Sequence, residues 1–140
     1  MKRTFMLSLS IMLVFSSVFM FMNIHEDTEA KIDLHDCVTY IPHPPIDING
    51  NPDFAMQAGV EGWPGDGSPG NPYIIENYEI NASLAHGIQI SLTTVHFRIK
   101  DALIRDGAST RNGINFDRVE NGVIENCMII NNRLGIMFSH

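Results

Sequence analysis

The stretch IENYEI at residues 75–80 decides the fold, because the chain repeats its pattern twice more. The later copies are IKDALI at residues 99–104 and IENCMI at residues 124–129, and the copies start 24 and 25 residues apart. Each copy begins and ends with Ile and has Asn or Asp at its third position. Two Ile five positions apart cannot face the same side of a straight strand, because side chains alternate with a period of two. The spacing therefore predicts a bend at the Asn or Asp, since both residue types tolerate a left-handed backbone.

A second motif alternates with the first. HGIQI at residues 86–90 recurs as NGINF at residues 112–116 and as LGIMF at residues 134–138. The two motifs keep their order with a period near 24 residues, and a fixed period of this size is typical of a solenoid. The segments are short, rich in Ile, Val and Phe, and alternate between apolar and polar residues, which indicates β-strands. The sequence therefore predicts an all-β solenoid with three short strands in each coil.

The bends of successive coils should lie above one another. Asn77, Asp101 and Asn126 would then form a ladder with a spacing of about 4.8 Å, in which amide side chains can hydrogen-bond along the stack. The side chains expected to point inward and form the core are Ile88, Ile90, Phe97, Ile99, Ala102, Ile104, Ile114, Phe116, Ile124, Cys127, Ile129, Ile136 and Phe138.

Two further segments extend the pattern towards the N-terminus, PIDINGNPDF at residues 45–54 and GDGSPGNPYIIENYEI at residues 65–80. With the repeats, they resemble right-handed parallel β-helix proteins of the pectin-lyase type, in particular secreted archaeal and bacterial surface proteins with NosD-like repeats. The resemblance covers about Pro45 to His140. It implies a right-handed parallel β-helix, of which this chain holds an N-terminal portion of roughly two to three coils. The middle copy departs from the pattern, with Asp101 in place of Asn.

The first segment of the chain is expected to be a signal peptide. Two basic residues precede an uncharged run over residues 5–22, and the small residues Thr28 and Ala30 follow at suitable positions before a cleavage site. A basic start, an apolar run and small residues before the cut are typical of secretory signals. The alternative is an uncleaved membrane anchor, because the run is about long enough to span a bilayer. Both interpretations place the rest of the chain outside the cytoplasm, secreted or on the cell surface.

The expected organisation is a signal peptide over residues 1–30, a linker and N-terminal cap region over residues 31–72, and β-helix repeats over residues 73–140. The last coil is incomplete where the sequence stops at His140. This predicts either continuation in a longer protein or end-to-end self-association, since an open stack edge can pair with another chain.

The charge of the chain constrains its partners. The formal net charge is −7 at pH 7, which argues against a nucleic-acid partner, because such proteins present a basic surface. Outside the cell an acidic balance favours solubility.

The best candidate for ligand binding is the outer face of the Gly-Ile strands. Gln89, Asn115 and Asp117 point outward by alternation, and His86 and Arg111 lie in the turns before these strands. By resemblance, sugars bind along one outer strand face, so a polysaccharide or cell-envelope glycan is the expected partner. The simpler interpretation is a solvated strand face, which alternation produces in any case.

Catalysis has weaker support. Glycoside hydrolysis needs two carboxyl groups about 5 to 10 Å apart, whereas Asp101, Asp106 and Asp117 fall on different sides of the coil. The resemblance to polysaccharide lyases implies calcium-binding carboxylates beside an arginine base, and no acidic pair adjoins an arginine in this pattern. The sequence leans against an enzyme and favours a secreted or cell-surface module with a structural or carbohydrate-recognition role. The alternatives are part of a carbohydrate-active enzyme and a NosD-like periplasmic copper-binding protein.

Three minor sites complete the predictions. The NosD resemblance suggests copper, for which His35, Cys37 and His43 are the available ligands. Asn81 begins an Asn-Ala-Ser glycosylation sequon. Cys127 could pair with Cys37 in an exported protein, and this pairing stays open. No cofactor other than copper or calcium is suggested.

Overall fold

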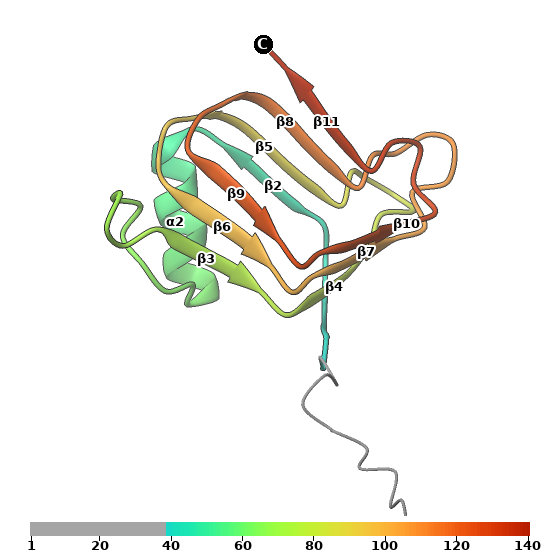
Figure 1. Ribbon diagram of the computed structural model, residues 1–140, viewed down its shortest axis with the longest axis horizontal. Coiled ribbons are helices and arrows are strands. Elements are labelled where there is room, and N and C mark those ends of the chain that lie inside the picture. Colours follow the sequence, from blue (N-terminus) through green and yellow to red (C-terminus); the bar gives the residue numbers. More distant parts are fainter. Residues whose placement is uncertain (1–38) are drawn as a thin grey trace, which may run out of the picture. The chain divides into compact units, whose positions relative to one another are not determined.

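The computed structural model describes residues 39–140, which form three parallel β-sheets and one helix (Figure 1). The predicted signal peptide, residues 1–30, lies outside the described residues. None of the helical structure in the described range is long and apolar enough to cross a membrane. The elements are β1 Ile41–His43, β2 Ile46–Asn49, α2 Asn51–Glu61, β3 Tyr73–Glu76, β4 Tyr78–Asn81, β5 Ile88–Thr93, β6 Phe97–Lys100, β7 Leu103–Arg105, β8 Ile114–Val119, β9 Gly122–Glu125, β10 Met128–Ile130 and β11 Ile136–Ser139.

The chain visits the three sheets in a fixed cyclic order. Sheet 1 has the strand order β1-β4-β7-β10, sheet 2 the order β2-β5-β8-β11, and sheet 3 the order β3-β6-β9. All pairings between these strands are parallel. One pass through the three sheets is called a coil below. The prediction of an all-β chain built from parallel strands is therefore confirmed.

The core lies between the three sheets and is built from columns of matching side chains. Ile46 pairs with Ile88, Ile88 with Ile114, and Ile114 with Ile136, so one Ile column runs through all four strands of sheet 2. Ile88, Ile90, Phe97, Ile99, Ala102, Ile104 and Ile114 have no exposed surface, and Phe116 is 3% exposed. The columns place apolar surface in contact along the whole stack, which is the main source of stability in such a core.

Bends at the Asn and Asp positions separate sheet 3 from sheet 1. Asn77, Asp101 and Asn126 have φ angles of 63°, 51° and 51°, which is the left-handed conformation that these residue types tolerate. Backbone hydrogen bonds join the bends along the stack: the Asp101 N–H donates to the Glu125 carbonyl (3.1 Å), and the Asn77 N–H donates to the Lys100 carbonyl (3.3 Å). The bends thus keep the apolar residues on both sides of them pointing inward.

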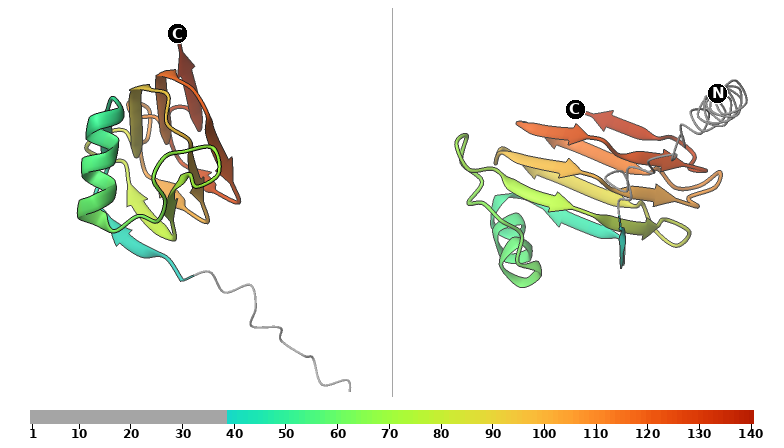
Figure 2. Two further views of the ribbon diagram at one scale, coloured as in Figure 1. Left: turned by 90° about the vertical axis from the view of Figure 1, so that its left-hand side faces the viewer. Right: turned by 60° about the horizontal axis from the view of Figure 1, so that its bottom comes forward.

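Helix α2 lies at the end of the stack opposite to β11 (Figure 2). Pro52 stands in its first turn and Gly62 ends it in the left-handed conformation, both of which are common helix signals. Phe54 and Ala58 of the helix are buried. The Phe54 ring stacks on the Tyr73 ring with 5.1 Å between their centroids, and its centroid lies 5.2 Å from that of Phe97. The helix therefore closes this end of the core.

The paired strands begin earlier than the repeats suggest. β1 pairs with β4 and β2 pairs with β5, so strands of the stack already occur within residues 31–72, the region expected to be a linker and cap. This part lacks the Gly-Ile motif, since Pro45 stands before Ile46 where Gly87 stands before Ile88 in the next coil. The Ile46-x-Ile48 pair nevertheless continues the inward columns of Ile88 and Ile90.

Candidate functional site: a polar groove on the outer face of sheet 2

The outer face of sheet 2 presents two cross-strand rows of mainly polar side chains. Strand register defines the rows, because residues in register lie about 4.8 Å apart along the stack. The first row holds Asp47, Gln89, Asn115 and Met137, and the second holds Asn49, Ser91, Asp117 and Ser139. Three of the five side chains expected to bind a ligand, Gln89, Asn115 and Asp117, therefore belong to these rows.

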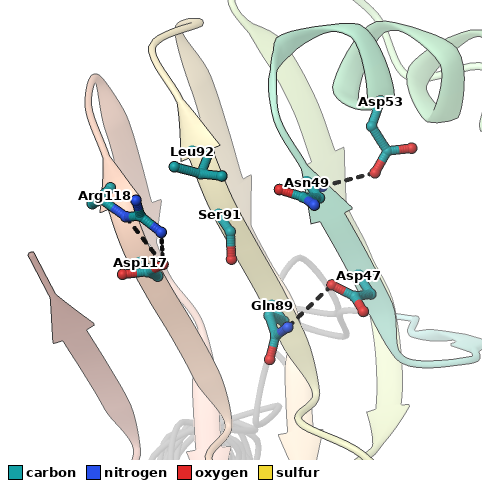
Figure 3. Close-up of a pocket in the computed structure, with 8 residues that line it drawn as sticks. All are labelled: Asp47, Asn49, Asp53, Gln89, Ser91, Leu92, Asp117 and Arg118. Atoms are coloured by element: carbon teal, nitrogen blue, oxygen red, sulfur yellow. Dashed lines mark hydrogen bonds and ion pairs between the residues drawn. The ribbon is translucent and has the colours of Figure 1, made fainter.

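The second row borders a hollow of about 420 Å³. Side chains from β2, β5 and β8 line it, together with one from the first turn of α2 (Figure 3). The lining residues are Asp47, Asn49, Asp53, Gln89, Ser91, Leu92, Asp117 and Arg118.

A second hollow of about 340 Å³ adjoins the first and shares Asp47 and Gln89 with it. His86 and Arg111 line this second hollow, so the structure brings both turn residues next to Gln89. The two hollows are called the sheet 2 groove below. Its His86 and Arg111 end is basic, and its other end contains most of the carboxylates.

Hydrogen bonds between neighbouring elements fix the walls of the groove. The Gln89 amide Nε2 donates to Asp47 Oδ1 at 3.2 Å. The Asn49 backbone N–H donates to Asp53 Oδ2 at 2.7 Å, which connects β2 to the first turn of α2. These bonds orient Asp47 and Asp53 (Figure 3), so the acidic wall is held in place before any ligand arrives.

Asp117 in the groove is held by contacts with Arg118 and Ser139. Arg118 Nη2 donates to Asp117 Oδ2 at 3.0 Å, and Ser139 Oγ lies 3.2 Å from Asp117 Oδ1. The hydrogen bond from Arg118, with the attraction of its charge and the contact with Ser139, holds the pKa of Asp117 below its ordinary value. Asp117 therefore stays ionised even in mildly acidic solution.

A row of left-handed residues interrupts the strands beside the groove. Gly50, Leu92 and Arg118 have φ angles of 88°, 55° and 51°, and they follow Asn49, Ser91 and Asp117 in the second row. Glycine adopts this conformation readily, but leucine rarely does. Leu92 is nevertheless 47% exposed and lines the first hollow. Gly50, Leu92 and Arg118 occupy equivalent positions in successive coils, so the strand bend imposes the conformation, and at residue 92 it presents an apolar side chain to the hollow.

Asn115 is held differently from the other row members. Asn112 Nδ2 donates to Asn115 Oδ1 at 3.2 Å, and the Asn112 backbone N–H donates to His86 Nδ1 at 2.9 Å. Asn112 is itself buried. This chain of bonds connects the turn before β5 to the turn before β8, so it positions His86 at the basic end of the groove.

Of the three residues proposed for copper, His43 is the one in the described part of the chain, and His35 and Cys37 lie outside it. His43 Nε2 lies 3.3 Å from Glu61 Oε2, and Nδ1 faces the Pro44 carbonyl at 2.7 Å, so both ring nitrogens already face acceptors. Within residues 39–140, no three His, Cys, Asp or Glu side chains are grouped so that they could hold a metal ion.

Several other predicted residues lie apart from the groove. Asp101 is at the bend before β7 and Asp106 follows β7, so neither is beside Asp117 on β8. Asn81 is exposed at the end of β4, and its Oδ1 accepts a hydrogen bond from the Ser83 N–H at 2.9 Å. Cys127 is a free thiol, partly buried against the core.

The groove also contains residues that the sequence pattern does not indicate. Asp47 and Asn49 stand in a strand without the Gly-Ile motif, and Asp53 comes from a helix that no repeat predicts. Leu92 and Arg118 occupy left-handed positions for which neither residue type is a signal. The alternation Ile46-Asp47-Ile48-Asn49, matched to Ile88-Gln89-Ile90-Ser91, is the one pattern that could have identified the first two.

No protein-family model, no curated protein and no solved structure matches this chain.

Proposed function

We propose that the chain is part of a right-handed parallel β-helix that acts outside the cell as a glycan-recognition module. The sheet 2 groove is the binding surface. The observation that carries the proposal is the pair of adjoining hollows on one sheet face, lined by side chains from β2, β5 and β8 and sharing Asp47 and Gln89.

The side chains of the groove suit sugar hydroxyl groups. Carboxylates accept hydrogen bonds from hydroxyls, whereas amides and the Ser91 hydroxyl both donate and accept. Leu92 adds an exposed apolar surface against which the carbon face of a sugar ring can pack. A small number of placed polar groups beside an apolar contact is the usual composition of a ligand site.

The repeating register supports an extended ligand. Equivalent positions on β2, β5 and β8 follow each other at the strand spacing of about 4.8 Å, so a chain-like ligand meets a similar polar group at each coil. A polysaccharide that lies across the strands would contact both rows. The walls are pre-oriented by the bonds of Gln89 to Asp47 and of Asn49 to Asp53, which lowers the entropy cost of binding.

The first experiment is a binding screen of neutral and acidic oligosaccharides, followed by titration calorimetry of each hit. The Asn49→Ala/Ser91→Ala double variant should weaken binding about thirtyfold, because each of the two lost hydrogen bonds contributes on the order of 1 kcal/mol. Thr110→Ala is the matched control, since Thr110 is exposed in the turn after β7 and does not line the groove.

Two results would overturn the proposal. One is the absence of binding to every oligosaccharide in the screen. The other is equal weakening by the Thr110→Ala control and the double variant. Release of shorter sugars during incubation would instead show catalysis, and the recognition role would then be replaced by an enzymatic one.

A further inference from the structure

The two hollows of the sheet 2 groove differ in charge. Arg111 and His86 line the second hollow alone, whereas Asp53 and Asp117 line the first hollow alone. Asp47 lines both hollows, so it stands at their boundary. A ligand that fills the groove therefore meets hydrogen-bond donors on one side of Asp47 and carboxylates on the other.

The Arg111 guanidinium is available to bind an anion. Within residues 39–140, four Lys or Arg side chains each pair with a carboxylate, namely Arg98, Lys100, Arg105 and Arg118. No ion pair in this range involves Arg111, which is exposed in the turn before β8. A guanidinium presents its N–H donors in a planar fork that matches a carboxylate or a tetrahedral oxyanion. The second hollow therefore contains a cation that can pair with an acidic ligand.

His86 adds a second donor beside Arg111. The Asn112 backbone N–H donates to His86 Nδ1 at 2.9 Å, so Nδ1 is an acceptor and the ring proton lies on Nε2. Asn112 is 2% exposed, which fixes this bond in the turn before β8. Within the described part of the chain, Nε2 has no hydrogen-bond partner. Its N–H can therefore be donated to the same anionic group.

An apolar wall lies beside these two donors. Leu84 and Ala85 precede His86 in its turn and line the second hollow together with Pro45. Leu84 is 86% exposed, so a sugar ring can pack its carbon face against this wall while its acidic substituent meets Arg111. Apolar walls with a few placed polar groups are usual in ligand sites.

The first hollow has the opposite preference. Arg118 is the one cation among its lining residues, and it already pairs with Asp117 at 3.0 Å. The hydrogen-bond donors to Asp47 and Asp53 are a neutral amide and a backbone N–H, so these two carboxylate charges are not balanced by a cation. A further anion placed there would be repelled. The first hollow therefore suits an uncharged sugar.

We propose that the sheet 2 groove binds a glycan in which an acidic sugar adjoins an uncharged one. This inference rests on the proposed function and names the ligand class of the same groove. The anionic group, a carboxylate or a sulfate ester, lies at Arg111 and His86, and the uncharged sugar occupies the first hollow. A glycan that is acidic at every sugar is disfavoured, because one of its charges would face Asp53.

Titration calorimetry with four tetrasaccharides tests the ligand class. Hyaluronan alternates carboxylate-bearing and uncharged sugars, and keratan sulfate with sulfate on its glucosamine units alone alternates sulfated and uncharged ones. Oligogalacturonate is acidic at every sugar, and chitotetraose is uncharged. At least one alternating ligand should bind about tenfold or more tightly than the last two, and the better of the pair identifies the anion. Its affinity should fall as the salt concentration rises.

Three variants assign the preference to the two hollows. Arg111→Gln should weaken the alternating ligand about tenfold or more and leave chitotetraose unchanged. Asp53→Asn keeps an oxygen for the Asn49 N–H but removes a repelling charge, so it should strengthen oligogalacturonate binding about threefold. Arg98→Gln is the matched control, since it removes the same charge from sheet 3 and Arg98 lines neither hollow.

The outcomes separate this inference from the proposed function. Oligogalacturonate or chitotetraose binding as tightly as the alternating ligands would overturn the ligand class, and so would an Arg111→Gln effect no larger than that of Arg98→Gln. The same holds if another glycan of the wider screen binds and none of these four does. In each of these cases a glycan is still bound, so the recognition role stands. If no glycan binds at all, the recognition role fails and the ligand class fails with it.

Discussion

The carbonyl oxygen of Gly113 lies against the backbone of Gly87, one coil below, so closely that a Cβ at residue 87 would come within 2.6 Å of it. The same Cβ would lie 2.3 Å from Ile104 Cγ2. The Gly-Ile motif therefore needs its glycine because neighbouring coils approach each other closely at the corner where sheet 2 begins.

Gly113→Ala should destabilise the fold strongly, whereas Gly135→Ala should not. A Cβ at Gly113 would lie 2.3 Å from Ile129 Cγ2 and 2.7 Å from the Gly135 carbonyl, while the nearest atom at Gly135 is 3.9 Å away. Overpacking of this kind costs about 1–3 kcal/mol. Urea unfolding of both variants gives the difference, and equal stabilities would show that the close contact is not present in solution.

Phe97→Ala should lower the free energy of unfolding by about 3–5 kcal/mol, because a fully buried aromatic ring leaves a cavity when it is removed. Phe97 has no exposed surface and contacts both Phe54 and Phe116. Leu84→Ala is the control, since Leu84 is 86% exposed. Chemical denaturation monitored by the fluorescence of Trp63 measures both changes. If Phe97→Ala lowers the free energy of unfolding no more than Leu84→Ala does, the Phe97 ring is not packed in the core as described.

Asp101→Gly should be tolerated and Asp101→Val should not, because the φ of Asp101 is 51°. Glycine adopts this conformation at no steric cost, whereas a β-branched residue there is strained by about 1–3 kcal/mol. Thermal unfolding of the two variants gives the order. A valine variant as stable as the glycine variant would mean that the bend can rearrange.

The pKa of Asp117 should rise when Arg118 is replaced by Gln, because the hydrogen bond from Arg118 is the main cause of its lowered value. A carboxyl group with a depressed folded-state pKa contributes stability above its unfolded pKa. That contribution disappears as pH falls through the folded-state pKa. NMR titration of the side-chain carboxyl carbon measures the shift, with Asp66 as the reference, whose lowered pKa arises from Ser68 instead. If the pKa of Asp117 is the same in Arg118→Gln as in the unmodified protein, Arg118 and Asp117 do not form an ion pair in solution.

The Cys127 thiol should react slowly with alkylating reagents at neutral pH. Its pKa is raised by burial, and the thiolate is the reactive form. Its Sγ lies 3.3 Å from the Glu125 carbonyl and 3.6 Å from the Ile99 carbonyl. The rate constant in native buffer should be far below that in urea, and equal rates would indicate that the last coil opens readily.

The repeats predicted the core because each inward Ile or Phe has a counterpart one coil away. Ile88, Ile90, Phe97 and Ile99 were all expected inside and have no exposed surface. Phe138, predicted inward by the same rule, is 65% exposed, because no further strand lies over it in the described structure. Alternation determines the direction of a side chain, but burial also requires a neighbour on the other side.

Part of the groove was predicted for the same reason. Gln89, Asn115 and Asp117 follow from the outward phase of the Gly-Ile strands. Asp53 was missed because α2 has only a weak amphipathic pattern and occurs once, so no repeat marks it. Leu92 was missed because its left-handed conformation is imposed by the strand bend and not by its own preference.

Each described coil pairs only with the coils directly above and below it. In sheet 2, for example, Ile88 pairs with Ile46 on one side and with Ile114 on the other, and Ile114 pairs in turn with Ile136. Solenoids of this kind behave as one-dimensional chains of interacting units. Within residues 39–140, a coil that opens locally loses its contacts with its neighbours, and the coil beside Phe54 also loses its contacts with α2. Local opening should therefore cost the most free energy in the coil that the helix covers.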